Sequence, residues 1–170
     1  RVYGSVGALS AQLRTASPAV NALLRVKTAE AQKHGVAMDV IVRSAWEGLP
    51  AQGWEMCRVL GNLIDNAMDA LKDTPSPRVT VTLGEELRAL IFSVENNGPE
   101  IPMEIREKIF QPGFTTKGGE RGQGLAIVRE IIAGYGGELT LESDENHTAF
   151  CGRLPRGAAQ PPEKERGESK

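Results

Sequence analysis

The stretch that decides the fold is Trp54-Glu-Met-Cys-Arg-Val-Leu-Gly-Asn62-Leu-Ile-Asp65-Asn66-Ala-Met-Asp69-Ala-Leu71. Its apolar residues recur at the i, i+3, i+4, i+7 spacing that places side chains on one face of an α-helix. They are Met56, Val59, Leu60, Leu63, Ile64, Ala67, Met68 and Leu71. The pattern predicts a helix that packs this face against the core of the protein.

Polar residues share the opposite face of the same helix, and they are Asn62, Asn66, Asp69 and Asp73. A merely solvated face would favour Glu, Lys or Arg, because asparagine is a mediocre helix former whose side chain competes for the backbone. Amide oxygens combined with carboxylates suit Mg²⁺, which prefers oxygen ligands and keeps several waters and substrate phosphates. The helix alone leaves two interpretations open, a Mg²⁺ site and a polar face without function.

The composition predicts one globular domain. The 170 residues are 40% hydrophobic and 25% charged, which is enough to bury one core. The formal net charge of -2 gives no overall attraction to nucleic acid or to an anionic membrane surface. The sequence has no apolar stretch of bilayer length and no secretory signal pattern at Arg1, so we expect a cytosolic location. Cys57 and Cys151 have neither CxxC spacing nor His companions, so we expect no disulfide framework and no zinc site.

Helical and strand patterns mix along the chain. Ser17 as a cap followed by Pro18 predicts a helix start. We expect helices at 18–33, 54–71, 102–110 and 125–135, strands at 36–42, 78–83, 87–94, 138–142 and 148–154, and a hairpin loop at 84–86. This order predicts an α+β fold, a two-layer sandwich in which a mixed, mostly antiparallel sheet packs against helices.

Two loops carry candidate binding chemistry. The segment Lys117-Gly-Gly-Glu-Arg-Gly122-Gln-Gly124-Leu precedes a helix, so its backbone N–H groups and the helix N-terminus are suited to hold phosphates. It is neither a Walker loop nor a dinucleotide fingerprint, because no glycine precedes Lys-Ser or Lys-Thr and no strand precedes the segment. The other loop is Val94-Glu-Asn96-Asn97-Gly98-Pro99-Glu100-Ile101-Pro102, a strand exit followed by a turn. Taken singly, a flexible surface loop explains the glycine-rich segment as well as a phosphate site does, and an ordinary turn is the favoured interpretation of the other segment.

The order of the segments resembles the catalytic ATP-binding domain of sensor histidine kinases, which has the Bergerat-type fold also found in gyrase. The asparagine helix comes first, then the Asn-Gly-Pro turn, then Phe110-Gln-Pro-Gly-Phe-Thr-Thr-Lys117, and then Gly-x-Gly-Leu at a helix start. The match covers roughly 19–154. Within the kinases the sequence is most similar to the citrate and dicarboxylate sensor branch. The segments that carry this likeness are Ser17-Pro-Ala-Val-Asn-Ala-Leu-Leu, Leu60-Gly-Asn-Leu-Ile-Asp-Asn-Ala-Met-Asp-Ala-Leu and Thr116-Lys-Gly-Gly-Glu-Arg-Gly-Gln-Gly-Leu-Ala-Ile-Val.

The resemblance implies ATP and Mg²⁺ as cofactors and assigns a role to each matching residue. Asn66 matches the Mg²⁺-binding asparagine, and Asn62, one turn earlier, is a second polar contact near the metal and the phosphates. Gly98 and Ile101 match the turn and the apolar wall beside adenine, and Thr148 matches a strand hydroxyl that supports the adenine site through water. The lid corresponds to Phe114, Thr115, Thr116 and Lys117, and the glycine box around the phosphates to Gly118, Gly122, Gly124 and Leu125.

Two positions depart from the family pattern. The adenine-reading aspartate falls on Asn96, and the second glycine of the turn falls on Glu100. Asparagine accepts a hydrogen bond through its amide oxygen but lacks the charge that strengthens the bond. We therefore expect Asn96 to weaken adenine binding without abolishing it, while the direction of the effect of Glu100 stays open.

Asn62 separates the chemistries of related proteins. Hydrolysing relatives such as gyrase place a glutamate four residues before the metal asparagine as a general base, and an asparagine has no titratable group for this role. The resemblance therefore implies a protein histidine kinase that transfers the γ-phosphate to a histidine on a separate dimerisation domain through positioning and Mg²⁺ charge. No residue of this chain is assigned as catalytic, and we expect the chain alone to hydrolyse ATP very slowly.

The phosphoacceptor is expected outside this chain, because His34 and His147 have the sequence context of surface or capping residues. We expect 1–16 to be the tail of the dimerisation hairpin, 17–155 the ATP-binding domain and 156–170 a disordered tail. The implied partners are the phosphoacceptor hairpin and a response regulator, with no nucleic acid and no direct membrane contact. The implied location is a cytoplasmic domain of an inner-membrane protein. Two alternatives stay open: a degenerate nucleotide-binding or partner-docking module, and a hydrolase of the same fold.

Overall fold

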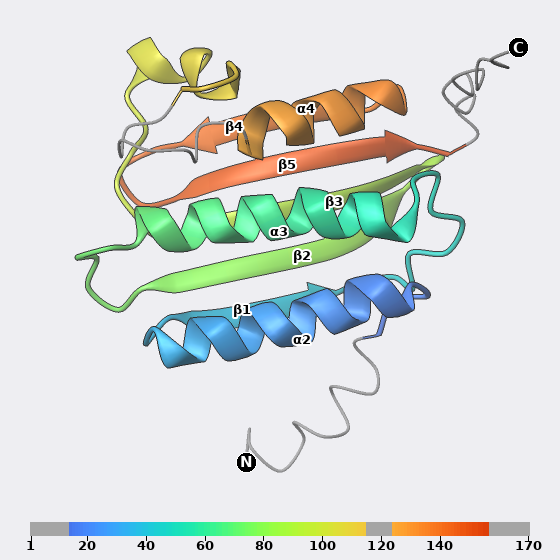
Figure 1. Cartoon of the computed structure of the whole chain (residues 1–170), viewed down its shortest axis with the longest axis horizontal. Helices are drawn as coiled ribbons and strands as arrows, with labels where there is room; N and C mark the ends of the chain where they lie inside the picture. The colour runs from blue at the N-terminus through green and yellow to red at the C-terminus, as the bar shows by residue number, and fades with distance from the viewer. Residues whose placement is uncertain (1–13, 115–123, 157–170) are drawn as a thin grey trace, which may run out of the picture.

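The computed structural model describes residues 14–114 and 124–156, in which helices cover one face of a five-stranded sheet (Figure 1). The strand order is β1-β2-β3-β5-β4. β1 (Ala37–Val42) pairs in parallel with β2 (Arg78–Glu86), and the other neighbours pair antiparallel. These others are β3 (Ala89–Asn96), β5 (Thr148–Pro155) and β4 (Glu138–Ser143). The predicted two-layer α+β sandwich with a mixed, mostly antiparallel sheet is confirmed.

Three helices form the second layer: α2 (Pro18–Lys33), α3 (Gly53–Ala70) and α4 (Gly124–Gly134), with α3 in the middle (Figure 1). α2 begins at the predicted cap, where Ser17 Oγ accepts from the Val20 backbone N–H at 3.4 Å. α3 buries the predicted apolar face, whose fully covered residues are Met56, Val59, Leu60, Gly61, Leu63, Ile64 and Ala67. Asp73 was expected on the polar face of this helix, but it lies beyond the last helical residue at φ 65°.

The core lies between the two layers, where side chains of neighbouring strands meet. Val81, Val94 and Phe150 are register partners and are buried. Gly152 leaves room for an aromatic ring, because a Cβ at this position would lie 2.0 Å from Phe92 Cζ. Trp46 closes one end of the core by packing edge-on to Phe92, with ring centroids 6.2 Å apart. Its indole Nε1 donates to the carbonyl oxygens of Gly84 at 3.0 Å and Ile91 at 3.2 Å.

Two predicted elements differ in the structure. The loop expected at 84–86 belongs to β2, since pairing continues to Glu86 opposite Ala89 and the turn consists of the next two residues. Gly84 serves the packing of Trp46 instead of a turn, and Arg88 takes the left-handed conformation at φ 61°. The single helix expected at 102–110 is instead two 3₁₀ turns, η2 (Met103–Ile105) and η3 (Lys108–Phe110). Arg106, between them, is anchored to backbone carbonyls of two segments, which favours short tight turns over a continuous helix.

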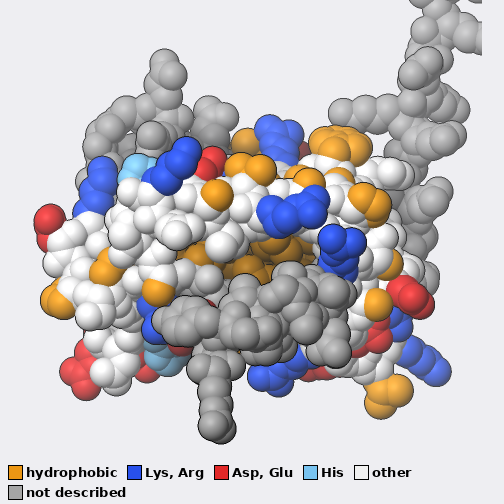
Figure 2. Space-filling view, turned by 90° about the horizontal axis from the view of Figure 1, so that it is seen from below, with side chains coloured by type: hydrophobic (Ala, Val, Ile, Leu, Met, Phe, Trp, Pro, Cys, Tyr) orange, Lys and Arg blue, Asp and Glu red, His pale blue; other side chains and the backbone are white. Residues whose placement is uncertain are grey.

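Charges of both signs are distributed over the face seen from the side of α2 and β1 (Figure 2). Basic and acidic side chains both appear on this face, in keeping with a formal net charge of -2. None of the described helices combines the length and apolar character that a membrane-spanning helix needs.

Candidate functional site

Two buried polar residues mark one end of the helix-covered face of the sheet. Asn96 ends β3 and Thr148 begins β5, and the two are register partners. Asn96 lies two residues from the core residue Val94, and Thr148 lies two residues from the core residue Phe150. Residues two apart in a strand point to the same face, so both side chains lie on the helix side of the sheet. Asn96 is 3% exposed and Thr148 is 2% exposed. A small number of polar groups set among apolar side chains is the composition of ligand sites, so this end of the face is a candidate binding site.

The turn after β3 packs directly against the end of α3. Asn96 Oδ1 accepts from the Gly98 backbone N–H at 2.9 Å. A Cβ on Gly98 would lie 2.8 Å from the Ala70 carbonyl oxygen and 2.9 Å from Asn96 Oδ1, so this position requires glycine. The predicted turn and the predicted asparagine helix therefore meet at Gly98.

The neighbouring Asn97 has a different, structural role. Its Oδ1 accepts from the Arg78 backbone N–H at 2.7 Å, and its Nδ2 donates to the Ser76 carbonyl oxygen at 2.9 Å. These bonds tie the exposed side chain of Asn97 to the segment that leads into β2. Only Asn96 of this pair is directed to the helix side.

A hydrogen-bond network holds Ile101, the residue expected beside adenine. Its backbone N–H donates to Ser143 Oγ at 2.9 Å, and that oxygen is 2.6 Å from Thr148 Oγ1. Arg106 donates from Nε to the Ile101 carbonyl at 3.0 Å and from Nη2 to the Ser143 carbonyl at 2.9 Å. The network connects the turn after β3 to the β4–β5 hairpin and links Ile101 to Thr148 through Ser143.

Glu100, which replaces a family glycine, is also held by this network. Its Oε1 lies 3.1 Å from Arg106 Nη2, and its side chain is 50% exposed. An ion pair this exposed contributes little stability, but it engages the carboxylate at the outer side of the turn.

The roles of Arg106 and Ser143 in this network were not predicted from the sequence. Ser143 is 42 positions from Ile101, so no local pattern connects them. The available signal was the predicted last hairpin, because its register places residue 143 opposite Thr148.

Asn62 and Asn66 lie on a face of α3 that connects the turn to α4. Asn62, Asn66 and Ala70 are successive i, i+4 positions and therefore line one side of the helix. Gly98 touches Ala70 at one end of this row. Gly124, the first residue of α4, meets Asn62 at the other end, where a Cβ on Gly124 would lie 3.3 Å from Asn62 Oδ1. The row is about 12 Å long at a rise of ~1.5 Å per residue.

The donor chemistry along this row fits a magnesium nucleotide. The N-terminus of α4 offers backbone N–H groups and a partial positive charge that favour an anion. The amide oxygens of Asn62 and Asn66, both half-buried, are of the type that Mg²⁺ prefers when substrate phosphates complete its coordination. We call the Gly124 end of this row the phosphate-type end and the end at Asn96 and Gly98 the base-type end, after the roles that the family resemblance implies for these residues.

Two further predicted residues are described, Phe114 of the lid and Leu125 of the glycine box. Both are half-buried and pack against the core. The segment that leads to Phe114 is anchored at Phe110, whose ring packs edge-on to Phe150 at 6.1 Å and lies 5.2 Å from the Arg129 guanidinium. The remaining predicted lid and glycine-box residues lie outside the described residues, and they are Thr115, Thr116, Lys117, Gly118 and Gly122.

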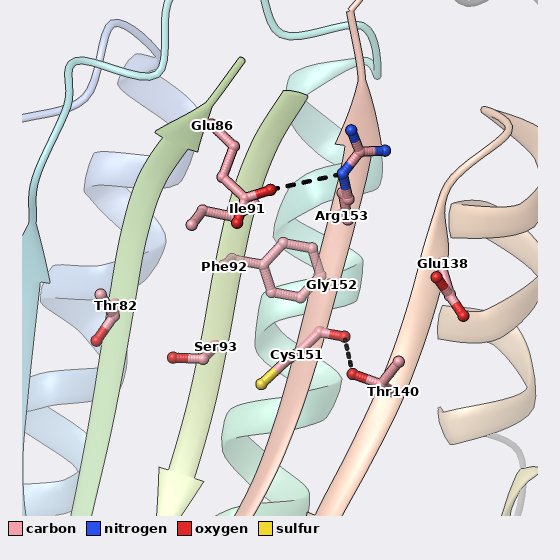
Figure 3. A pocket seen from close by; sticks show the side chains of 10 residues that line it. All are labelled: Thr82, Glu86, Ile91, Phe92, Ser93, Glu138, Thr140, Cys151, Gly152 and Arg153. Atoms are coloured by element: carbon pink, nitrogen blue, oxygen red, sulfur yellow. Dashed lines mark hydrogen bonds and ion pairs between the residues drawn. The ribbon is translucent and has the colours of Figure 1, made fainter. Parts of the chain in front are cut away.

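A cavity of about 290 Å³ lies elsewhere, on the sheet face that carries no helices (Figure 3). Its lining includes Arg153, whose Nε is 3.7 Å from Glu86 Oε2, and Cys151. Burial and, to a smaller extent, the carboxylates of Glu142 and Glu95 raise the pKa of the Cys151 thiol, which disfavours a reactive thiolate. The buried polar residues Asn96 and Thr148 face the other side, so we place the candidate functional site on the helix-covered face.

Comparison with known proteins gives a family match over more than half of the chain. The family model described as "Histidine kinase-, DNA gyrase B-, and HSP90-like ATPase" matches residues 54–158. Sensor protein CitS of Halalkalibacterium halodurans is 36% identical over 154 residues, which cover 86% of this chain and 28% of that protein. Sensor histidine kinase DcuS of Escherichia coli (strain K12) is 32% identical over 156 residues, which cover 88% of this chain and 28% of that protein. The chain therefore spans about 28% of the length of these curated relatives.

Solved structures show the same arrangement. The nucleotide-free catalytic domain of histidine kinase ThkA has a TM-score of 0.67 and 29% identity, with coverage of 81% of this chain and 92% of that domain. ThkA in complex with response regulator protein TrrA has a TM-score of 0.67 and 27% identity, with coverage of 84% of this chain and 40% of that chain.

Proposed function

The chain belongs to the family of histidine kinase-, DNA gyrase B- and HSP90-like ATPases, and we propose that it binds Mg-ATP and transfers the γ-phosphate to a histidine on a separate dimerisation domain. The observation that carries this proposal is the row from Gly98 to Gly124 along α3, in which a base-type end and a phosphate-type end are joined by two asparagines.

Each residue of the candidate site has a role in this proposal. Asn96 and Thr148 receive the base, and Ile101 covers it from the turn. Asn62 and Asn66 hold Mg²⁺, which neutralises phosphate charge when bound. Gly124 brings the α4 N-terminus to the phosphates. The chain positions the nucleotide, and the attacking nitrogen comes from the partner histidine.

Asn62 directs the chemistry towards a protein acceptor instead of water. A general base must hold a titratable group within hydrogen-bond reach of the proton it removes. Asn62 stands where Gly124 brings α4 against α3, and its amide does not titrate. Hydrolysis by the chain alone is therefore expected to be very slow.

The partners and the location extend the proposal beyond the chain itself. ThkA forms a complex with the response regulator TrrA, and we propose a response regulator and a phosphoacceptor hairpin as partners here. We propose residues 1–16 as the tail of that hairpin, 17–155 as the ATP-binding domain and 156–170 as a disordered tail. The domain would act on the cytoplasmic side of an inner-membrane sensor.

Phosphotransfer in trans tests this function. The chain is incubated with γ-labelled ATP, Mg²⁺ and its matched phosphoacceptor hairpin, and acid-labile label on the hairpin histidine is measured. We expect labelling by the wild type and a loss of at least about tenfold for Asn66→Ala. Asp65→Ala is the matched control, since Asp65 neighbours Asn66 but is exposed and pairs with Lys27 at 2.8 Å.

A degenerate docking module is the second candidate function. It is favoured by Asn96 and Glu100, because the family pattern has an aspartate and a glycine at these two positions. Such a module gives no phosphohistidine even at high Mg-ATP, while the hairpin still binds it. Hairpin binding without labelling in the same experiment would therefore replace the kinase assignment with this one.

A further inference from the structure

Asn96 offers the site a hydrogen-bond donor as well as an acceptor. The Gly98 N–H can only donate, so its 2.9 Å contact identifies the near end of the amide as Oδ1. Among the described residues, none accepts a hydrogen bond from Asn96 Nδ2, and the one side-chain bond of Asn96 is that of Oδ1. Every fully buried side-chain nitrogen or oxygen of the described residues has a hydrogen-bond partner. Asn96 as a whole is 3% exposed, and within the described residues Nδ2 keeps both of its N–H groups for a ligand.

This donor belongs to a residue that is itself part of the base-type end of the site. The side chain lies on the helix side of the sheet, beside Thr148 and below the turn at Gly98. Because Oδ1 is fixed by the turn, the amide cannot exchange its two ends without breaking the bond to Gly98. The second lone pair of Oδ1 and the N–H groups of Nδ2 remain for a ligand.

We propose that this site accepts 6-oxopurine nucleotides as well as ATP, an inference that rests on the proposed nucleotide-binding function. Adenine carries an amino group at position 6, from which Oδ1 accepts. Hypoxanthine and guanine carry a carbonyl oxygen there, to which Nδ2 donates. An aspartate at position 96 has only acceptor oxygens, so it pairs with the amino group and faces the 6-oxo group with a like-charged atom. Asn96 is thus the residue that sets the base specificity.

The expected effect is a change in relative affinity. When binding a ligand leaves a buried polar group of the site unpaired, the affinity for that ligand falls by one to several orders of magnitude. For the wild type we expect dissociation constants for inosine triphosphate and ATP within about tenfold of each other. For Asn96→Asp we expect the ratio to rise at least about tenfold in favour of ATP.

Isothermal titration of the full chain with Mg-ATP and Mg-inosine triphosphate tests the proposal. Inosine triphosphate is the probe because it changes the base at positions 6 and 1 without adding a 2-amino group. Asn97→Asp is the matched control: it makes the same chemical change one residue away, at a side chain bonded to Arg78 and Ser76, and should leave the ratio unchanged.

The outcomes distinguish this inference from the function on which it rests. ATP binding with rejection of inosine triphosphate by more than about a hundredfold in the wild type overturns the specificity proposal and leaves the kinase assignment standing. An unchanged ratio in a folded Asn96→Asp also overturns it. If neither nucleotide binds, the proposed function itself is wrong. The wild-type ratio needs no variant, so a folding defect in Asn96→Asp would not prevent the test.

Discussion

Gly98→Ala tests the contact on which the site is built. An added Cβ would lie 2.8 Å from the Ala70 carbonyl oxygen, about 0.6 Å inside the 3.4 Å at which ordinary contact begins. The same Cβ would lie 2.9 Å from Asn96 Oδ1. The carbonyl belongs to the last residue of α3, so the turn must move instead. Overpacking of this kind costs about 1–3 kcal/mol.

The same movement should weaken nucleotide binding. The turn carries the N–H that holds Asn96 and continues to Ile101, so its displacement disturbs the base-type end of the site. We expect Gly98→Ala to lower the affinity for Mg-ATP at least about tenfold, the effect of losing one well-placed contact of ~1.4 kcal/mol.

Urea unfolding and isothermal titration measure the two effects. With a slope of ~1–3 kcal/mol per M, the stability loss moves the urea midpoint by about 1 M. Gly134→Ala is the matched control, because Gly134 ends α4 with no neighbour within 4 Å of an added Cβ; it should leave stability unchanged or raise it by up to ~1 kcal/mol. A loss below about 0.5 kcal/mol for Gly98→Ala, together with unchanged ATP affinity, would refute the proposed packing of the turn on α3.

Three further changes probe other contacts. Arg106→Met keeps the length of the side chain but removes its bonds to Ile101 and Ser143, so we expect a three- to tenfold weaker Mg-ATP affinity, roughly one lost hydrogen bond; equal affinities by titration would contradict this role. Backbone N–H bonds hold the pKa of Asp144 below its ordinary value of 3.8. Its stabilising contribution is therefore complete above pH 3.8 and lost as the pH falls through the lower folded value. Thermal unfolding of Asp144→Asn should show a smaller loss of stability in acid than the wild type, and identical acid profiles would count against the assignment. Tyr135→Phe removes a 2.7 Å hydrogen bond to Glu55 that joins α4 to α3, and chemical unfolding should show a loss of ~1–2 kcal/mol, whereas an unchanged midpoint would exclude a stabilising role.

Local sequence patterns were sufficient for most of the architecture. The apolar spacing of α3 gave its helix and its buried face, because that spacing is a property of one element. The β2–β3 turn was misplaced, since Gly84 looks like a turn residue in sequence but is held in the strand by Trp46, a residue 38 positions away. Asp73 left the polar face because the helix ended earlier than its pattern indicated.

The site was predicted less completely, because its residues meet through tertiary contacts. The family resemblance pointed to Asn62, Asn96 and Thr148, and the structure brings the last two together as register partners. Arg106 and Ser143 had no local signature, since their partners lie on distant segments. The free amide nitrogen of Asn96 also required the structure, because only the bond to the turn shows which end of the amide is engaged.

Backbone amide chemical-shift mapping with Mg-ATP tests the central claim most directly. We expect the largest shifts along the α3 row and the adjoining turn on the helix-covered face, at Asn62, Asn66, Gly98, Ile101 and Gly124. We expect small shifts around the open-face cavity that Cys151 lines. Shifts concentrated at that cavity, or no shifts at saturating Mg-ATP, would contradict the assignment of this site as a nucleotide-binding site.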